Sequence, residues 1–341
     1  MTTRPVKSRV TSFDIALKVG VSQPTVSRAL RGSKRVSAET RAKVLEAAAE
    51  LNYIVDRNAS SLRTQATNVI ALVVICQQGE ARTAINPFYF SLLGCIAAAA
   101  ADEGYNLMVS FQESRGNFFG YYEDSRQADG LIIIGSARNA EAWDYFEKVQ
   151  QDGRSVICWG GPDNRFASIR SANDEGAVLA VRHLHAKGRE NIVFVGPTIS
   201  PQAQFEERYR GYARTMEELG LTPHATYPEG AFAREQEGYE ATAALIRSGR
   251  AFDAIFAVCD LVALGVLRCL HDHDIAVPGD VSVIGFDGIR AGEHSHPPLT
   301  TVEPDLVVAG KLLIDNLLSM MDGEDISGAR APVELVLRES D

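Results

Sequence analysis

Hydrophobic residues in the first fifty positions recur at every third or fourth residue, which is the spacing of amphipathic helices. Residues 10–30, VTSFDIALKVGVSQPTVSRAL, predict two short helices joined by a tight turn at Gly20-Val21-Ser22. A third helix is predicted to begin at Ser37, a favourable N-cap residue, and to run through ETRAKVLEAAAELN. The residues expected to form the core of this three-helix unit are Ile15, Ala16, Val19, Val26, Leu30, Val44, Leu45, Ala48 and Leu51.

From residue 68 the pattern changes to continuous apolar runs of strand length. These runs alternate with helical stretches such as GAVLAVRHLHAKG and LVALGVLRCLHDH. Strands that are apolar on both faces and alternate with helices predict parallel sheets covered by helices, an α/β fold. The elements are too many for one modest sheet, so two α/β lobes are expected. The predicted strands are NVIALVVIC, YNLMVSF, DGLIIIG, RSVICWG, ENIVFVG, FDAIFAV and VSVIGF.

Residues 55–66, between these two patterns, form a polar segment whose apolar content is limited to Ala59 and Leu62. The segment is long enough for one or two helical turns. Because so short a helix is marginal in water, we expect it to become ordered only in contact with something else.

The length and composition fit a soluble protein of two or three units. A chain of 341 residues is too long for one ordinary core. Hydrophobic residues make up 45% and charged residues 23%, and no apolar run approaches the length that spans a bilayer. The basic start, MTTRPVKSRV, is not followed by an apolar segment, so we expect no secretory signal and a cytoplasmic location.

The net charge of −10 is distributed unevenly along the chain. Residues 1–64 contain 12 lysines and arginines against 5 acidic residues, whereas the rest of the chain contains 22 against 39. Positive charge concentrated in one small unit favours phosphate binding through counterion release. The acidic remainder would resist indiscriminate adhesion to DNA.

The predicted second helix presents polar and basic side chains outward, among them Gln23, Pro24, Thr25, Ser27 and Arg28. Two short helices around a tight turn, with such a face on the second helix, have the geometry of a helix-turn-helix that enters the major groove of DNA.

Metal and disulfide chemistry have little support in the sequence. The five cysteines are an odd number at wide spacings without a CxxC motif, so buried reduced thiols are expected. His-x-His occurs at His183/His185, His271/His273 and His294/His296. Two residues apart on a helix, the first pair cannot share an ion, and the second lies near a helix C-terminus. The third pair lies in a loop, where a metal site is a minor alternative.

The segments FDIALKVGVSQPTVSRALRG, RVSAETRAKVLEAAAELNY, NPFYFSLLGCIAAAAADEGY, EERYRGYARTMEELGL, CDLVALGVL, VPGDVSVIGFDGI and PPLTTV follow one another in a characteristic order. Together they resemble the lactose-repressor (LacI/GalR-type) family of bacterial transcription regulators over nearly the whole chain. The resemblance implies a DNA-reading headpiece, a hinge helix and a body like periplasmic sugar-binding proteins, assembled as a dimer on a near-palindromic operator.

The resemblance also implies that the chain crosses between the two lobes near Ala172, Thr301 and Gly328. The expected domains are the headpiece with its basic arm at 1–54, the hinge at 55–66, the N-terminal effector lobe at 67–172 plus 302–328, and the C-terminal effector lobe at 173–301 plus 329–341.

Several residues match DNA-contacting positions of the family. Gln23 and Pro24 correspond to positions that select the operator, where a glutamine can pair with adenine and a proline can touch a thymine methyl group. Arg28 corresponds to an arginine that reads guanine in relatives. Ser22 is suited to cap the second helix and to touch a phosphate. The remaining matches are Thr11, Thr25 and Ser27, at phosphate or framework positions.

Leu62 matches a leucine that the family inserts into the minor groove at the operator centre, where a wedge unstacks a base step and kinks the duplex. Ala59 lies one turn earlier on the same helix face. The alternative is that Leu62 packs on the body as a buried linker residue. At Val55-Asp56 the chain departs from the Pro-Asn that often precedes the hinge in the family.

The family's effector cleft supplies a second set of matches. An aromatic group with an arginine and one or two aspartates suits a polar ring such as a sugar. Gly160-Gly161 and Cys259 replace residues common in sugar-responsive relatives, and Trp159 adds an apolar face, so a modified sugar, a glycoside or a nucleoside is expected. The matching residues are Phe88, Tyr89, Trp159, Asn173, Arg208, Phe232, Cys259, Asp260 and Asp287.

The alternative class is an enzyme, or a pure ligand-carrying receptor, built on the two-lobed body. No nucleophile elbow, Walker loop or HExxH motif occurs, and neither alternative requires a basic headpiece. The sequence therefore predicts a ligand-responsive DNA-binding regulator, most simply a repressor, that uses neither a metal nor a cofactor.

Overall fold

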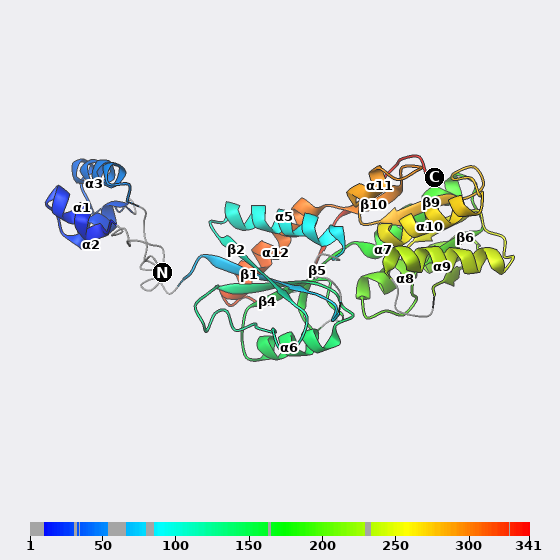
Figure 1. The fold of residues 1–341 in the computed structure, drawn as a ribbon, viewed down its shortest axis with the longest axis horizontal. Coiled ribbons are helices and arrows are strands. Elements are labelled where there is room, and N and C mark those ends of the chain that lie inside the picture. Colours follow the sequence, from blue (N-terminus) through cyan, green and yellow to red (C-terminus); the bar gives the residue numbers. More distant parts are fainter. Residues whose placement is uncertain are drawn as a thin grey trace, which may run out of the picture. The chain divides into compact units, whose positions relative to one another are not determined.

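The computed structural model describes residues 10–30, 33, 35–53, 66–79, 85–162, 165–228, 233–326 and 328–341. It divides into two compact units, residues 1–67 and residues 68–341 (Figure 1). None of the helices in these described ranges is both long enough and apolar enough to cross a membrane.

The first unit contains the three helices that the sequence predicts: α1 (Ser12–Val19), α2 (Gln23–Leu30) and α3 (Ala38–Glu50). At the start of α1, the backbone N–H and the hydroxyl of Thr11 both donate to Asp14 Oδ2 at 2.8 Å. Gly20 ends this helix in the left-handed conformation, with φ of 75°. Helix α1 is therefore fixed at both of its ends by local chemistry.

The core of the three-helix unit differs from the prediction at one position on α3. Val44, Ala47 and Ala48 are buried, whereas Leu45 is 47% exposed. Positions 44, 47, 48 and 51 form a single helical stripe, and residue 45 lies about 100° around the helix from residue 44. The helical spacing of Val44 and Ala48 is correct, but it does not include Leu45.

The first lobe of the second unit is built on a six-stranded sheet, in which the strand order is β11-β5-β4-β3-β1-β2 and every pairing is parallel. Alternate residues of β1 face opposite sides, so Ile70 and Leu72 pack under α5 and α12, whereas Ala71 and Val73 pack against α6. The elements of this lobe are β1 (Val69–Ile75), α5 (Pro87–Asp102), β2 (Asn106–Gln112), β3 (Gly130–Gly135), α6 (Ala140–Gln151), β4 (Val156–Trp159), β5 (Ala167–Ser171), α12 (Leu306–Met321) and β11 (Ala329–Ala331).

Residues 113–128, between β2 and β3, contain no helix. Gln112 anchors this segment, because its Oε1 accepts from the Phe119 N–H at 2.8 Å and its Nε2 donates to the Phe119 carbonyl at 2.9 Å. Phe118, Tyr121 and Tyr122 pack on the core beside α6. These aromatic side chains cover the sheet where the apolar stripe of a helix would otherwise lie.

The second lobe has its own six-stranded sheet, in which the strand order is β12-β10-β9-β8-β6-β7 and only β12 is antiparallel to its neighbour. Its strands are buried beneath four long helices. The elements of this lobe are α7 (Asn173–Ala186), β6 (Ile192–Val195), α8 (Ala203–Glu218), β7 (His224–Thr226), α9 (Arg234–Arg247), β8 (Ala254–Ala257), α10 (Asp260–Asp272), β9 (Ser282–Phe286), α11 (Arg290–Glu293), β10 (Thr300–Pro304) and β12 (Val333–Val336).

The chain passes between the lobes at Ala172, at Asp305 and at Pro332, so two expected boundaries need correction. The expected crossing near Thr301 is too early, because β10 stays paired with β12 as far as Pro304. The expected crossing near Gly328 is also too early, because Ala329–Ala331 still pair with β5 of the first sheet. In both cases the hydrogen-bonded ladder continues beyond the residue that the sequence indicated.

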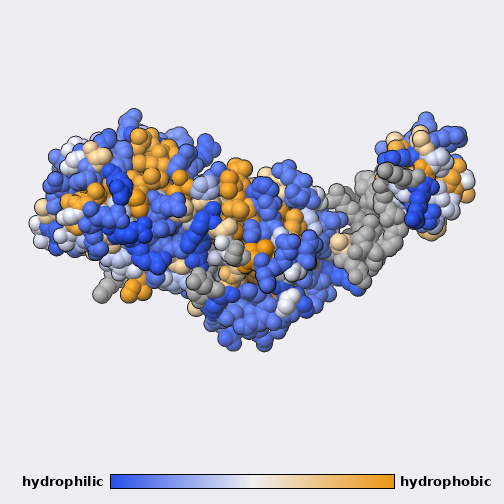
Figure 2. Space-filling view, turned by 180° about the vertical axis from the view of Figure 1, so that it is seen from behind, coloured by the Kyte–Doolittle hydropathy of each residue, from blue (hydrophilic) through white to orange (hydrophobic). Residues whose placement is uncertain are grey.

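The surface of the body is mainly hydrophilic, with hydrophobic patches between the hydrophilic regions (Figure 2). Phe90 and Val307, which are 47% and 74% exposed, belong to α5 and α12 of the first lobe. All five cysteines remain thiols, and four of them are buried. Within the described ranges, no cluster of three or more histidine, cysteine or acidic side chains could hold a metal ion.

Candidate functional site

A cavity of about 620 Å³ lies between the two lobes of the second unit. The first lobe contributes the start of α5 and the residues at the carboxyl ends of β1, β3 and β4. The second lobe contributes the starts of α8 and α9 and the residue that follows β9. The cavity thus lies at the carboxyl ends of parallel strands, where open α/β sheets bind ligands, and its size suits a small molecule.

One wall of the cavity is aromatic. Asn86 caps α5 by accepting from the Phe88 N–H at 3.0 Å, and Pro87 occupies the first helical position. This start places Phe88 with its ring centroid 5.6 Å from that of Tyr89 and 5.8 Å from that of Trp159. Tyr89 donates its hydroxyl to the Gly135 carbonyl at 2.9 Å. Burial, assisted by the nearby Asp287, raises the pKa of Tyr89 to about 12, so the phenol stays neutral.

The opposite wall contains Arg208 of α8, whose side chain is held by the second lobe. Its Nε donates to Asn173 Oδ1 at 2.9 Å, its Nη1 to the Val258 carbonyl at 2.6 Å, and its Nη2 lies 3.1 Å from Asp287 Oδ1. The guanidinium carbon is 3.6 Å from the centroid of the Phe286 ring. Burial raises the pKa of Asp287, although the Arg208 charge and hydrogen bond oppose that effect.

Five of the predicted effector contacts therefore line the cavity: Phe88, Tyr89, Trp159, Arg208 and Asp287. Three others need correction, because they are buried behind the wall: Asn173, Cys259 and Asp260. Phe232, the remaining predicted effector contact, lies outside the described residues, as do the hinge residues Ala59 and Leu62.

None of the three buried residues lines the cavity. Asn173 orients Arg208. Asp260 accepts from the Thr301 hydroxyl at 2.6 Å and from the Ile289 N–H at 2.9 Å, and burial raises its pKa to about 8. Burial also raises the pKa of Cys259 to about 12. Asn173 and Asp260 therefore position neighbouring groups, whereas Cys259 is a buried thiol.

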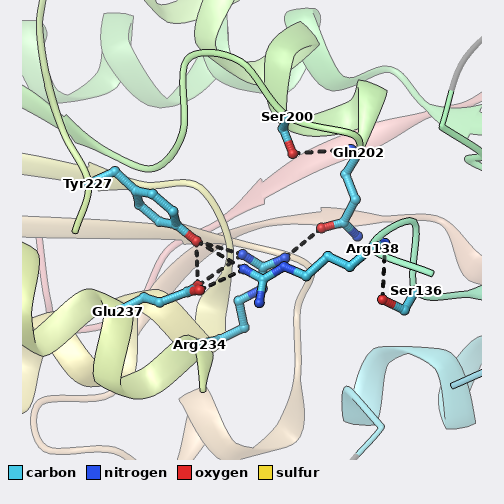
Figure 3. A network of polar contacts seen from close by, with 7 residues as sticks. All are labelled: Ser136, Arg138, Ser200, Gln202, Tyr227, Arg234 and Glu237. Carbon is cyan, nitrogen blue, oxygen red and sulfur yellow. Dashed lines mark hydrogen bonds and ion pairs between the residues drawn. The ribbon is translucent and has the colours of Figure 1, made fainter. Parts of the chain in front are cut away.

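The cavity also contains a polar network that the sequence analysis did not identify (Figure 3). Arg138, in the loop after β3, donates from Nη2 to Glu237 Oε1 at 2.6 Å. Arg234 Nη1 lies 2.9 Å from Glu237 Oε2 and 2.7 Å from the Tyr227 hydroxyl, and its Nη2 donates to Gln202 Oε1 at 2.6 Å. The position of Arg138 after a predicted strand is the signal that could have identified it. Arg234 has no comparable signal.

Several polar contacts cross from one lobe to the other. Arg138 of the first lobe pairs with Glu237 of the second, and Asn86 hydrogen-bonds Asp287. The Glu207 carboxylate of α8 is buried between Arg170 Nη1 at 3.1 Å and Arg330 Nη1 at 2.7 Å. The lobes are therefore held together both within the cavity and beside the crossings.

In the first unit, five of the predicted DNA-reading residues lie on α2, Ser22 directly precedes that helix, and Thr11 precedes α1. Ser22, Pro24 and Arg28 are exposed, whereas Gln23, Thr25 and Ser27 are partly buried. The Ser22 hydroxyl lies 2.8 Å from the Thr25 hydroxyl, and Gln23 Nε2 donates to Ser12 Oγ of α1 at 3.2 Å. Thr11 is exposed and caps α1.

Comparison with known protein families gives two matches. Residues 13–56 match the model of the bacterial regulatory proteins of the lacI family, and residues 181–340 match a periplasmic binding protein-like domain.

Individual proteins resemble the chain over nearly its whole length. The HTH-type transcriptional repressor PurR of Haemophilus influenzae is 28% identical over 336 residues, which cover 96% of this chain and 97% of the relative. A crystal structure of the lac repressor dimer bound to operator and an anti-inducer has a TM-score of 0.77 at 26% identity, covering 98% of this chain and 99% of the other. The CelR–cellobiose complex has a TM-score of 0.66 at 26% identity and covers 98% and 100%.

Proposed function

Because this chain is a DNA-binding transcriptional regulator of the lacI type with an effector-binding body, we propose that it is a dimeric repressor whose operator affinity is set by a small polar effector. The observation that carries the proposal is the cavity walled by residues of both lobes. A molecule bound there has a different affinity for closed and separated lobes, and only that difference can shift the equilibrium between them. The role places the protein in the cytoplasm, with the DNA.

Two first units of a dimer would read the two half-sites of a near-palindromic operator, about one helical turn apart. In this proposal Gln23 pairs with adenine, Pro24 touches a thymine methyl group, and Arg28 reads guanine. The exposure of Pro24 and Arg28 on α2 supports this arrangement. The four residues proposed to contact or orient the backbone are Thr11, Ser22, Thr25 and Ser27.

The hinge provides the proposed link between effector and operator. Leu62 from each protomer would enter the minor groove at the operator centre, with Ala59 on the same helix face. If the effector separates the hinges, their short helices melt and specific affinity falls, whereas a corepressor would have the opposite effect. The lac repressor relative, whose structure holds operator and an anti-inducer together, supports coupling of this kind.

A sugar-like or nucleoside-like effector fits the aromatic wall, where Phe88, Tyr89 and Trp159 offer faces for ring stacking. CelR, a relative of the same fold, binds cellobiose in its crystal structure. An enzymatic role has no support from the relatives, which are transcriptional regulators.

Selection of binding sites from random DNA tests the proposal. We expect a palindromic consensus whose affinity falls steeply with salt concentration. Arg28→Ala is expected to relax specificity at one position of each half-site, because a lost bidentate contact costs about 1–3 kcal/mol. Arg182→Ala, at an exposed ion pair with Glu218 in the body, serves as the control and should leave the consensus unchanged. A protein without preference for any sequence over competitor DNA at low salt would contradict the proposal.

A further inference from the structure

The described part of the cavity lining contains more positive than negative charge. Its cations are Arg138, Arg208 and Arg234, and its anions are Asp287 and the exposed Glu235 at the rim. Arg208 is balanced by Asp287 at 3.1 Å. Arg138 and Arg234 are not balanced individually, because both contact the same carboxylate, that of Glu237.

The Glu237 carboxylate is already fully engaged. Its side chain is completely buried, and its oxygens contact Arg138, Arg234 and the Tyr227 hydroxyl. Burial alone would raise its pKa, but Arg234, Tyr227 and Arg138 together hold the pKa below its usual range, so the group is ionised. Two guanidinium groups thus share one negative charge and leave one positive charge uncompensated among these residues. Glu235 compensates little, because an exposed carboxylate is screened by water.

The two arginines also have hydrogen-bond donors to spare. Arg138 uses only Nη2, so its Nε and Nη1 make no hydrogen bond to the described residues. Arg234 uses Nη1 and Nη2, which leaves Nε without a hydrogen-bond partner in the same ranges. Figure 3 shows the two guanidinium groups close together, reached from different lobes.

Gln204, at the start of α8, provides a second and independent indication of a ligand. The residue is only 8% exposed and lines the cavity, yet its Oε1 has no hydrogen-bond partner in the described ranges. A buried polar atom without a partner is costly, and rotation of the amide to meet a ligand hydroxyl or N–H would remove that cost.

We propose that the effector carries a negatively charged group, a carboxylate or a phosphate ester, that binds between Arg138 and Arg234, with Gln204 taking a hydroxyl or N–H of its ring. This inference rests on the proposed function and specifies the effector class. A planar guanidinium fork matches both kinds of anion, and a neutral ring would leave the extra, partly buried charge uncompensated. Because Arg138 comes from the first lobe and Arg234 from the second, the anion bridges the lobes and favours their closure.

Isothermal titration of the full-length protein at constant ionic strength tests this site. The probes are D-gluconate, D-glucose 6-phosphate and inorganic phosphate, with D-glucose as the neutral counterpart. We expect at least one anionic sugar to bind about tenfold or more tightly than glucose, as one charge-assisted contact implies. Gluconate and glucose 6-phosphate distinguish a carboxylate from a phosphate effector, and inorganic phosphate probes the anion subsite alone.

Arg138→Gln and Arg234→Gln should each weaken binding of the anionic sugar about tenfold and leave glucose unaffected. Arg138→Lys keeps the positive charge but loses the planar bidentate guanidinium, so an intermediate affinity for the anionic sugar is expected. Because this substitution is conservative, it also controls for loss of binding through misfolding. The control is Arg115→Gln, at an ion pair with Glu141 in which Arg115 is 83% exposed, and it should leave all affinities unchanged.

Operator binding by the same preparations separates the two proposals. Equal affinities for glucose and its anionic analogues, failure of every anion to bind, or unchanged anion binding in Arg138→Gln would overturn the anionic site. Intact operator binding in those cases would leave the regulatory function standing. Absence of specific DNA binding would contradict the regulatory function whatever binds in the cavity.

Discussion

Arg208 has no freedom to reorient towards a ligand, because each of its terminal groups is held by the second lobe. Asn173, the Val258 carbonyl and Asp287 surround its guanidinium group, and Phe286 stacks below it. A ligand therefore meets a preformed ion pair, and no ordering cost arises at that position. The buried charge of Asp287 depends on Arg208 for its compensation, since no other cation among the described residues lies as close to it.

Replacing Arg208 by alanine should be strongly destabilising. The substitution leaves Asp287 buried without its cation, so we expect the free energy of unfolding in urea to fall by about 3–5 kcal/mol. Asp287→Asn in the same background should recover part of this loss, because a neutral amide needs no counter-charge. Equal stability of the single and the double variant would show that the Asp287 charge does not cause the loss.

Asp260 should make the stability of the body depend on pH. Burial raises its pKa to about 8, above the value in an unfolded chain, so the folded protein binds this proton more tightly. The resulting stabilisation is fully present below the unfolded value, near pH 4, and is lost as the pH rises towards about 8.

Asp260→Asn should remove that part of the pH dependence, since an amide can still bond the Thr301 hydroxyl and the Ile289 N–H. Urea unfolding at pH 5 and at pH 8 measures it. The variant should lose less stability between the two values than the unmodified protein. The difference isolates Asp260 from Asp287, whose raised pKa acts in the same direction. Equal losses would mean that Asp260 stays ionised throughout.

Sequence position identified the residues that follow a strand or open a helix near the cavity, such as Asp287, Phe88 and Trp159. It could not separate Asp260 from a true lining residue, because that distinction depends on which way one side chain turns at the start of α10. Asp260 turns inward towards Gly285, where any larger residue would collide with its carboxylate. Glu237 and Arg234 escaped detection because they open an ordinary amphipathic helix.

At the level of elements, Glu207 joins α8 of the second lobe to β5 and β11 of the first. Its carboxylate is 5% exposed and contacts Arg170, which is 7% exposed, and Arg330, which is 48% exposed. Burial would raise the pKa of Glu207, but Arg330, Asn173 and Arg170 together hold it below its usual range. The carboxylate therefore fixes the second lobe beside the crossings.

Glu207→Ala and Arg330→Ala should differ sharply. Loss of Glu207 leaves the Arg170 charge buried without this partner, so we expect a loss of about 3 kcal/mol in the free energy of unfolding. Loss of Arg330 removes a half-exposed cation, and Arg170 and Asn173 still satisfy the carboxylate, so about 1 kcal/mol or less is expected. Parallel urea titrations of the two variants give the comparison, and similar losses would refute the role given to Glu207.

The apolar runs predicted β1, β2, β3, β4, β6, β8 and β9, but they missed β5 and β10, which lie inside the two sheets and whose short sequences, ASIRS and TTVEP, are not apolar runs. The edge strands β7, β11 and β12 are short and only partly buried, so they produce no such run. That is why the second and third crossings were placed a few residues too early. The segment 113–128 shows the same limit, since its packing depends on scattered aromatic residues without a period.

At the scale of the whole molecule, the two lobes approach each other closely at Gly160. This residue has φ of +81°, and a Cβ atom placed on it would lie 2.0 Å from Gln204 Nε2 of the other lobe. If residue 160 carries a side chain, the Gln204 amide or the backbone at residue 160 has to move. Glycine is therefore favoured here by the backbone conformation, and a side chain at this position would also displace the Gln204 amide.

Gly160→Ala should lower effector affinity at least several-fold, because the methyl group displaces the Gln204 amide or keeps the lobes apart. Gly153→Ala is the matched control, since its φ is +84° and nothing lies within 4 Å of the added atom. Both variants should lose about 1 kcal/mol of stability from the left-handed conformation. Only the first should change effector binding, measured by titration, and equal binding by both would show that the contact is unimportant.

The three crossings also determine how such a protein can be recombined. Exchanging the second lobe with that of a relative requires junctions at Ala172, Asp305 and Pro332, whereas exchanging the first unit requires a single junction near Thr67. The first unit, which is proposed to read the operator, can therefore be exchanged between relatives as one contiguous segment. Ligand selectivity is divided between the two lobes, because both line the cavity, so exchange of one lobe would change only one of its walls.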